Sequence, residues 1–213
     1  MEKYYYQRNV IYTLAQWGNQ PMNAIRLAIW IDAPAERCFL LSLNIDLRVA
    51  SGRESGEDAI EGVTSGLIGE GQTVTFQGRP FGFRGRHTNR MEIVRPYSYF
   101  RDVMIDGQFE RYEHDHHFAP MDDGTRIRDE VTFSLGWGLE RIGARKRLAA
   151  CLKQRNAMIK RVAESEEWRK YLGEGVGERT VVAPAQAAPA KRWNGAALMA
   201  GSQRMILPRG PNG

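Results

Sequence analysis

Residues 109–133 read FERYEHDHHFAPMDDGTRIRDEVTF, and this stretch decides the fold. Its two halves alternate apolar and polar residues with the period of two that is typical of β-strands. The run Met121-Asp122-Asp123-Gly124 between them has the chemistry of a four-residue hairpin loop, so the halves are predicted to pair antiparallel. The residues expected on the inner face are Tyr112, His114, His116 and Phe118 of the first strand and Ile127, Asp129, Val131 and Phe133 of the second.

The inner face of this hairpin carries ionisable groups where a plain core would carry aliphatic side chains. The loop sets a register in which Phe118 lies opposite Ile127 and His116 lies opposite Asp129. His117 points to the other face and is expected in solvent. Polar groups on an otherwise apolar inner face indicate a cavity.

Further segments with strand periodicity precede the hairpin, and turn residues separate them. A helix is expected from Pro34 to about Leu43 or Leu47, and a long helix from about Leu139 to Tyr171. The apolar stripe of the long helix must be covered, and the sheet is the surface available, so the chain is predicted to be α+β. The other expected strands are Ile25–Ile31, a weak strand at Ile60–Thr64, Thr73–Gln77, Phe83–Val94 and Tyr97–Ile105.

The loop at residues 106–108 decides which way the preceding strand faces. A three-residue loop is favoured over a two-residue turn because it places Phe100 and Met104 inside. Asp102 then lies on the inner face of the hairpin as a further polar candidate. The arginines expected in solvent on the strand before it are Arg84, Arg86 and Arg90.

The positive charge of the chain is concentrated toward its C-terminal end. The 213 residues carry a net charge of +5, made up of −4 in residues 1–139, +6 in residues 140–173 and +3 in residues 174–213. A solvated helix face is the commoner cause of such a basic run. No zinc-ligand spacing, helix-turn-helix or aromatic-interleaved basic motif accompanies it, so nucleic-acid binding is not expected.

Composition divides the chain into an N-terminal extension of residues 1–23, a domain of residues 24–172 and a tail of residues 173–213. The tail is basic, is rich in Ala, Pro and Gly, has no sustained hydrophobic period and is expected to be disordered. Cys38 and Cys151 make neither a disulfide framework nor a metal motif, which indicates a reducing compartment. Because no signal peptide or membrane-spanning segment is recognised, a cytoplasmic protein is expected.

Several short motifs have a recognisable pattern across about residues 24–168. The most particular is the Tyr-x-His-x-His-x-Phe strand of residues 112–118, followed by Gly124-Thr125 and Asp129. The other matching residues are Ile31–Glu36 with Phe39, Gly66–Ile68 and on to Phe76, Thr88–Met91, Phe100–Asp102, Phe109, and Arg155-Asn156. In these residues the chain resembles the START-like, or SRPBCC, superfamily, and within it a bacterial ligand-binding group of polyketide cyclase/dehydrase type.

The resemblance implies the helix-grip fold, a curved antiparallel sheet wrapped around a long C-terminal helix with an internal cavity. This fold hosts lipid carriers, hormone receptors, aromatic polyketide cyclases and chaperone regulators, so it implies little about chemistry. The predicted function is binding of a small, mainly apolar ligand, such as a lipid, polyketide or aromatic metabolite, in a cavity between the sheet and the C-terminal helix, with no cofactor. The expected ligand contacts are Phe100, Asp102, Tyr112, His114, His116, Phe118, Asp129, Val131 and Phe133.

The histidines and Asp129 have three competing interpretations. In the first, His116 and Asp129 are a hydrogen-bonded pair that fixes the hairpin register and satisfies itself. In the second, which is compatible with the first, the same groups line a pocket and orient the polar end of a ligand. In the third, Asp129 holds one tautomer of His116, which moves a proton in an aldol-type cyclisation or dehydration. No nucleophile, oxyanion hole or second general acid accompanies that candidate acid–base pair.

Two further alternatives stay open. His114, His116 and Asp129 could supply three metal ligands, with His87 as a helper, but strand histidines are usually not ligands and no metal is expected. The chain could also be an interaction module that contacts a protein or an anionic surface through its basic helix and tail.

Overall fold

The computed structural model describes the backbone of residues 6–7, 10–17, 20–79, 84–135 and 143–174, and the side chains of these residues from Asn23 onward, Leu135 excepted. The strands are β1 (Tyr6–Gln7), β2 (Val10–Trp17), β3 (Gln20–Ile31), β4 (Asp58–Gly62), β5 (Thr73–Gly78), β6 (Gly85–Arg95), β7 (Tyr99–Asp106), β8 (Phe109–Met121) and β9 (Gly124–Leu135). The helices are α1 (Ala35–Leu43), α2 (Ile45–Ser51), α3 (Ala144–Ala163) and α4 (Trp168–Leu172), with a 3-10 turn at Arg53–Ser55.

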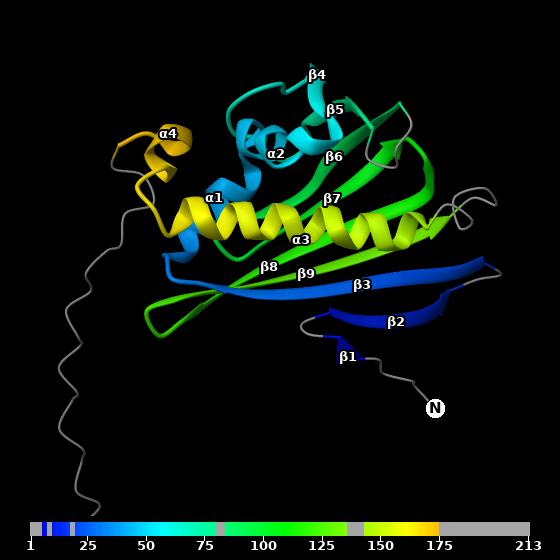
Figure 1. The fold of residues 1–213 in the computed structure, drawn as a ribbon, viewed down its shortest axis with the longest axis horizontal. Helices are drawn as coiled ribbons and strands as arrows, with labels where there is room; N and C mark the ends of the chain where they lie inside the picture. The colour runs from blue at the N-terminus through cyan, green and yellow to red at the C-terminus, as the bar shows by residue number, and fades with distance from the viewer. Residues whose placement is uncertain (1–5, 8–9, 18–19, 80–83, 136–142, 175–213) are drawn as a thin grey trace, which may run out of the picture. The chain divides into compact units, whose positions relative to one another are not determined.

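The described strands form one antiparallel sheet in the order β1-β2-β3-β9-β8-β7-β6-β5-β4. Figure 1 shows this sheet curving beneath α3, which lies along its inner face, while α1 and α2 stand beside α3 at the β5–β6 side. The expected α+β arrangement is therefore confirmed. The extension expected at residues 1–23 contains β1, β2 and the beginning of β3, so strand pairing continues into it.

The register predicted for the central hairpin is confirmed, although its loop is shorter than expected. His116 pairs with Asp129 and Phe118 pairs with Ile127. Met121 also pairs with Gly124, which leaves a loop of two residues rather than four. A Cβ at Gly124 would stand 2.5 Å from the carbonyl oxygen of Ile31, so only glycine fits here.

The helices are more divided than the sequence pattern predicts. The first expected helix ends at Leu43, and α2 begins anew because the Asn44 side chain accepts a hydrogen bond from the Leu47 amide at 2.9 Å. The long helix expected to reach Tyr171 ends at Ala163. After it the chain turns into α4, which buries Trp168 beneath the Arg37 guanidinium. Residues 139–142 lie outside the described part of the chain.

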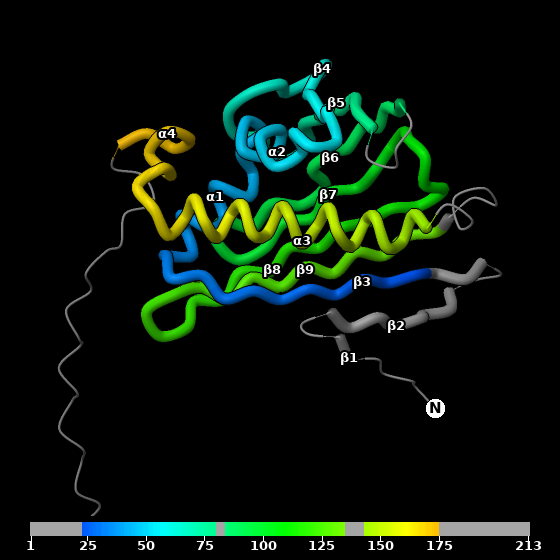
Figure 2. Tube along the Cα trace, viewed as in Figure 1, coloured from blue at the N-terminus to red at the C-terminus, as the bar shows by residue number. Residues whose placement is uncertain are grey.

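The apolar core consists of two clusters, and the tube in Figure 2 follows the elements that supply them. The first cluster joins α1, α2 and the end of α3 to the sheet and includes Phe39, Phe100, Phe118 and Trp168. The second lies beneath the first half of α3; it comprises Ile25, Leu27, Phe109, Tyr112, Val131, Phe133, Ala144, Leu148, Ala149 and Leu152, with Met104 packed against it. None of the helices in the described residues combines the length and apolarity needed to cross a bilayer.

Candidate functional site

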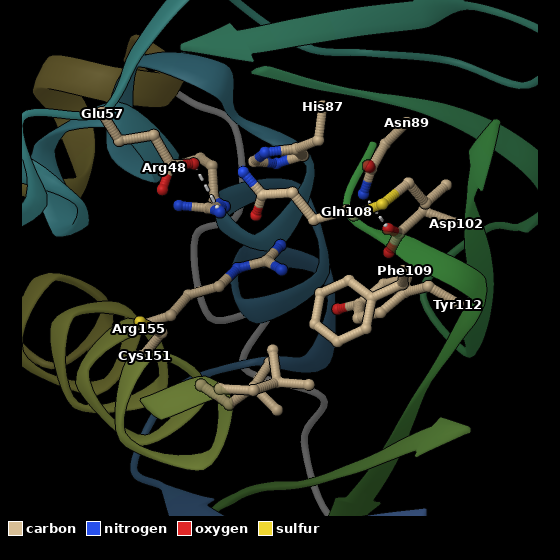
Figure 3. A pocket seen from close by; sticks show the side chains of 13 residues that line it. Arg48, Glu57, His87, Asn89, Asp102, Gln108, Phe109, Tyr112, Cys151 and Arg155 are labelled. Carbon is tan, nitrogen blue, oxygen red and sulfur yellow. Dashed lines mark hydrogen bonds and ion pairs between the residues drawn. The ribbon is translucent and has the colours of Figure 1, made fainter. Parts of the chain in front are cut away.

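A cavity of about 80 Å³ lies between the sheet and helices α2 and α3. It is small beside the roughly 300–1,000 Å³ of drug-sized ligand pockets. Its lining residues, shown in Figure 3, are Arg48, Glu57, His87, Asn89, Asp102, Met104, Gln108, Phe109, Tyr112, Leu148, Cys151, Leu152 and Arg155.

One wall of the cavity is apolar. Phe109 and Tyr112 of β8 are in contact, with ring centroids 5.5 Å apart, and both are buried. Leu148 and Leu152, one helical turn apart on α3, supply buried aliphatic surface from the opposite side. These side chains belong to the second apolar cluster, so the cavity is a gap in that cluster.

Two arginines enter the cavity from the helices. The Arg48 guanidinium of α2 forms an ion pair with Glu57, with Nη2 and Oε1 2.6 Å apart, and the Glu57 side chain is only 5 % exposed. Burial opposes the charge of Arg48, but Glu57 outweighs burial and raises the pKa of Arg48. This arginine therefore has a carboxylate to balance it.

Arg155 of α3 is placed differently. It lies on the same helix face as Leu148 and Leu152, at the spacing of the buried stripe, and its side chain reaches the cavity. Its Nη2 donates a hydrogen bond to the Ser42 carbonyl oxygen at 2.8 Å. No carboxylate in the described residues forms an ion pair with it. Burial, together with the positive charge of Arg48, lowers the pKa of Arg155.

Asp102 of β7 connects the cavity to a buried polar cluster. Its Oδ2 accepts a hydrogen bond from Asn89 Nδ2 at 2.6 Å, and its Oδ1 lies 3.2 Å from His116 Nε2. Tyr112 is the second connection, because its hydroxyl lies 3.4 Å from His114 Nδ1. Both Asp102 and Tyr112 line the cavity, whereas the two histidines lie behind them.

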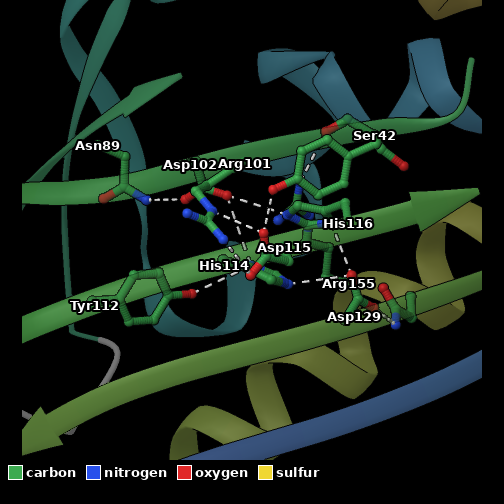
Figure 4. Close-up of polar contacts among 12 residues, drawn as sticks. Ser42, Asn89, Arg101, Asp102, Tyr112, His114, Asp115, His116, Asp129 and Arg155 are labelled. Atoms are coloured by element: carbon green, nitrogen blue, oxygen red, sulfur yellow. Dashed lines mark hydrogen bonds and ion pairs between the residues drawn. The ribbon is translucent and has the colours of Figure 1, made fainter. Parts of the chain in front are cut away.

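The cluster behind the cavity consists of Asp102, His114, His116 and Asp129 (Figure 4). Asp129 Oδ1 lies 3.2 Å from His114 Nε2 and 2.8 Å from His116 Nδ1, and Asp129 Oδ2 accepts a hydrogen bond from Asn156 of α3. The two imidazole rings are 3.6 Å apart between centroids. All four side chains are at least 94 % buried, so the cluster joins β7, β8 and β9 out of contact with water.

Burial and the neighbouring charges together set the protonation states of the four side chains in this cluster. Burial and the neighbouring His116 lower the pKa of His114 to about 4, so His114 is neutral at pH 7. Burial disfavours the charged forms of Asp102 and Asp129. Hydrogen bonds from the histidines outweigh it and hold the pKa of each carboxyl well below its usual value. The two aspartates are therefore carboxylates at neutral pH.

These shifts predict that folding stability falls in acid. Unfolded His114 takes up a proton near pH 6.5 and folded His114 only near pH 4, so the unfolded state binds more protons between them. The free energy of unfolding should therefore drop between pH 6.5 and 4 with a slope of up to about 1.4 kcal/mol per pH unit. Below pH 4 the depressed pKa values of Asp102 and Asp129 continue the loss.

Urea denaturation at pH 7.5, 6.5, 5.5 and 4.5 measures this slope. His114→Gln should reduce this slope between pH 6.5 and 4.5, and the remainder should come from His87 and His117, whose pKa values burial also lowers. A wild-type free energy of unfolding that stays constant from pH 7.5 to 4.5 would contradict the assignment.

The geometry of the cluster bears on the metal alternative. Asp102, His114 and His116 present ligand atoms within 4.8 Å of one another, so the set that the fold gathers contains Asp102 rather than the expected Asp129. Asp129 instead contacts both histidines from the other side. His87 lies in the cavity wall and is not part of this set.

The structure separates the nine expected ligand contacts into two groups. Asp102 and Tyr112 line the cavity. The other seven are not among its lining residues; they are buried in the apolar clusters or in the polar cluster: Phe100, His114, His116, Phe118, Asp129, Val131 and Phe133. The expected contacts of the cavity between the sheet and the C-terminal helix ran along the whole inner face of the hairpin, whereas tight packing closes most of that face.

Most lining residues are not among the nine expected ligand contacts, although the expected cavity did lie between the sheet and the C-terminal helix. Arg48 and Glu57 come from α2 and the segment before β4, and Leu148, Cys151 and Arg155 come from α3. A usable signal was present for Arg155, because it is a charged residue on the apolar stripe of the long helix. For Glu57, which lies between the 3-10 turn and β4, no comparable signal exists.

Comparison with solved structures decides the fold. A protein from Thermus thermophilus superposes with a TM-score of 0.53 at 20 % identity, over 65 % of this chain and 94 % of that one. A point mutant of norcoclaurine synthase from Thalictrum flavum gives 0.53 at 13 % identity, over 68 % and 96 %. The chain has the START-like, helix-grip fold. The expectation drawn from the sequence motifs is thereby confirmed for the fold.

The same fold occurs in a third solved protein, the di-domain ARO/CYC protein StfQ of the steffimycin biosynthetic pathway. It superposes on this START-like fold with a TM-score of 0.53 at 11 % identity, over 68 % of this chain and 52 % of StfQ. No family model and no curated protein matches the sequence. At these identities the likeness establishes the architecture and leaves the chemistry to the residues of the cavity.

Proposed function

We propose that this START-like chain binds a small, mainly apolar ligand in the cavity between the sheet and α3. The observation that carries the proposal is a gap in the second apolar cluster, walled by Phe109, Tyr112, Leu148 and Leu152 and edged by a few polar groups. Binding pockets for small molecules have this composition.

The structural neighbours support a small-molecule role. The norcoclaurine synthase structure contains a transition-state analogue, and StfQ belongs to a biosynthetic pathway. An acid–base reaction by His116 and Asp129 has less support, because neither side chain lines the cavity. The alternative of an interaction module depends on the basic helix and on the tail. Residues 175–213 of that tail lie outside the described part of the chain.

A larger side chain that fills the cavity should weaken binding of a neutral apolar probe. Leu148→Trp places an indole in the gap, and we expect it to weaken binding of N-phenyl-1-naphthylamine at least about tenfold, at a stability cost of about 1–3 kcal/mol. Fluorescence titration measures the affinity. Ala150→Trp, an exposed position on the same helix, is the matched control and should bind as the wild type does. Equal binding by both variants would place the probe elsewhere and sink the proposal.

A further inference from the structure

Arg155 is a partly buried arginine that forms no ion pair with a carboxylate of the described residues, although the charges of Asp102 and Asp129 favour its charged form. Its guanidinium has five N–H donors, and one of them donates to the Ser42 carbonyl oxygen. An N–H donor that is withdrawn from water without an acceptor costs free energy, so spare donors at a cavity wall point to a ligand that accepts from them. The remaining donors of Arg155 are available at the wall of the cavity.

The carboxylates in the cavity wall are already engaged. Glu57 forms its ion pair with Arg48. Both oxygens of Asp102 are occupied, one by Asn89 and the other by His116. The two arginines and two carboxylates of the wall balance in number, but neither carboxylate forms an ion pair with Arg155 in the described residues, so the spare N–H donors of Arg155 remain for a ligand.

We infer that the ligand of this cavity carries one carboxylate, which Arg155 binds while the apolar body lies against Phe109, Tyr112 and the leucines of α3. The inference rests on the proposed ligand-binding function and narrows its ligand class to apolar monocarboxylic acids. The planar guanidinium fork matches a carboxylate in two parallel hydrogen bonds. Gln108, which also lines the cavity, supplies an amide beside it.

The carboxylates already present favour a monoanion over a phosphate. One carboxylate can accept hydrogen bonds from Arg155 without disturbing the Arg48–Glu57 ion pair. A dianionic phosphate would bring a second negative charge into the same buried wall, where it would compete with Glu57 for Arg48. An uncharged amide would present its own N–H donors to the guanidinium and lose the attraction.

Matched pairs of acids and amides test the inference by isothermal titration calorimetry at pH 7.5. The pairs are benzoate with benzamide, 2-naphthoate with 2-naphthamide, and 4-phenylbutyrate with 4-phenylbutyramide. Each pair shares its apolar body, so the ratio of affinities isolates the charged group. We expect at least one acid to bind about tenfold more tightly than its amide.

Variants then assign the preference to Arg155. Arg155→Met should remove the preference for the acid while leaving amide affinity within about threefold, and Arg155→Lys should retain part of it because the charge remains. Lys153→Met removes the same charge from an exposed position on α3 and should change nothing. Glu57→Gln frees Arg48 and should strengthen acid binding by roughly threefold or more, a gain that a purely structural arginine would not produce.

The outcomes separate this inference from the function on which it rests. Amides that bind as tightly as their acids would overturn the carboxylate preference and leave apolar ligand binding standing. Acid selectivity that survives in both Arg155 variants would also overturn it. If neither the acids nor the amides bind and the neutral probe does not bind either, the proposed function falls as well.

Discussion

Replacing Asp129 with alanine should lower the free energy of unfolding by about 3–5 kcal/mol, because it breaks a fully buried polar cluster. Asp129 receives contacts from His114, His116 and Asn156, which come from β8 and α3. Without the carboxylate, two imidazoles and an amide lose their buried acceptor. Urea denaturation at pH 7.5, followed by circular dichroism, measures the loss.

The neighbouring residue provides the control for this substitution. Glu130 lies on the outer face and pairs with Arg26 at 2.6 Å, with both side chains partly exposed. Glu130→Ala should therefore cost no more than about 1 kcal/mol. A loss of similar size in both variants would show that the cluster contributes no more than an ordinary surface ion pair.

Phe100→Ala should destabilise the fold by about 3–5 kcal/mol and leave the affinity for apolar ligands within about threefold of the wild type. The Phe100 ring is fully buried, stacks on His116 at 4.0 Å and meets Phe39 edge-to-face at 5.7 Å. Removing the ring leaves a void in the first cluster that the neighbouring side chains cannot fill by changing rotamer. Thermal or urea unfolding gives the stability, and probe titration gives the affinity.

Phe109→Ala distinguishes a core aromatic from a cavity aromatic. Phe109 lines the cavity, so its truncation should weaken probe binding by more than Phe100→Ala does, with a smaller loss of stability. The reverse order, in which Phe100→Ala abolishes binding and Phe109→Ala does not, would return Phe100 to the binding wall.

The facing of the side chains and the register of the central hairpin were predictable because the sequence pattern that determines them is local. Alternation over residues 112–118 and 127–133 and a short turn determine which side chains share a face, and the register follows. The orientation of Asp102 was also correct, since it pairs with His114 across β7 and β8. Each of these features depends on spacing along neighbouring segments of chain.

The cavity was harder to predict because it depends on how tightly side chains from several elements pack together. His114, His116 and Phe100 lie on the face expected of a pocket, yet ring centroids only 3.6 and 4.0 Å apart leave no space between them. The gap opens instead where Leu148, Leu152 and Arg155 approach β8. The packing of α3 on the sheet determines where these residues come close to β8. The alternation pattern of a single strand contains no information about that packing.

The division of the core into two clusters has a consequence for how such a protein can change over generations. The apolar side chains that line the cavity belong to the second cluster or pack against it, and none belongs to the first. Substitutions at Met104, Phe109, Leu148 or Leu152 can therefore reshape the recognised molecule while the first cluster and the aspartate–histidine layer keep the fold stable. The residues that determine specificity are thereby separated from those of the first cluster, so a new ligand preference can arise while the first cluster stays intact.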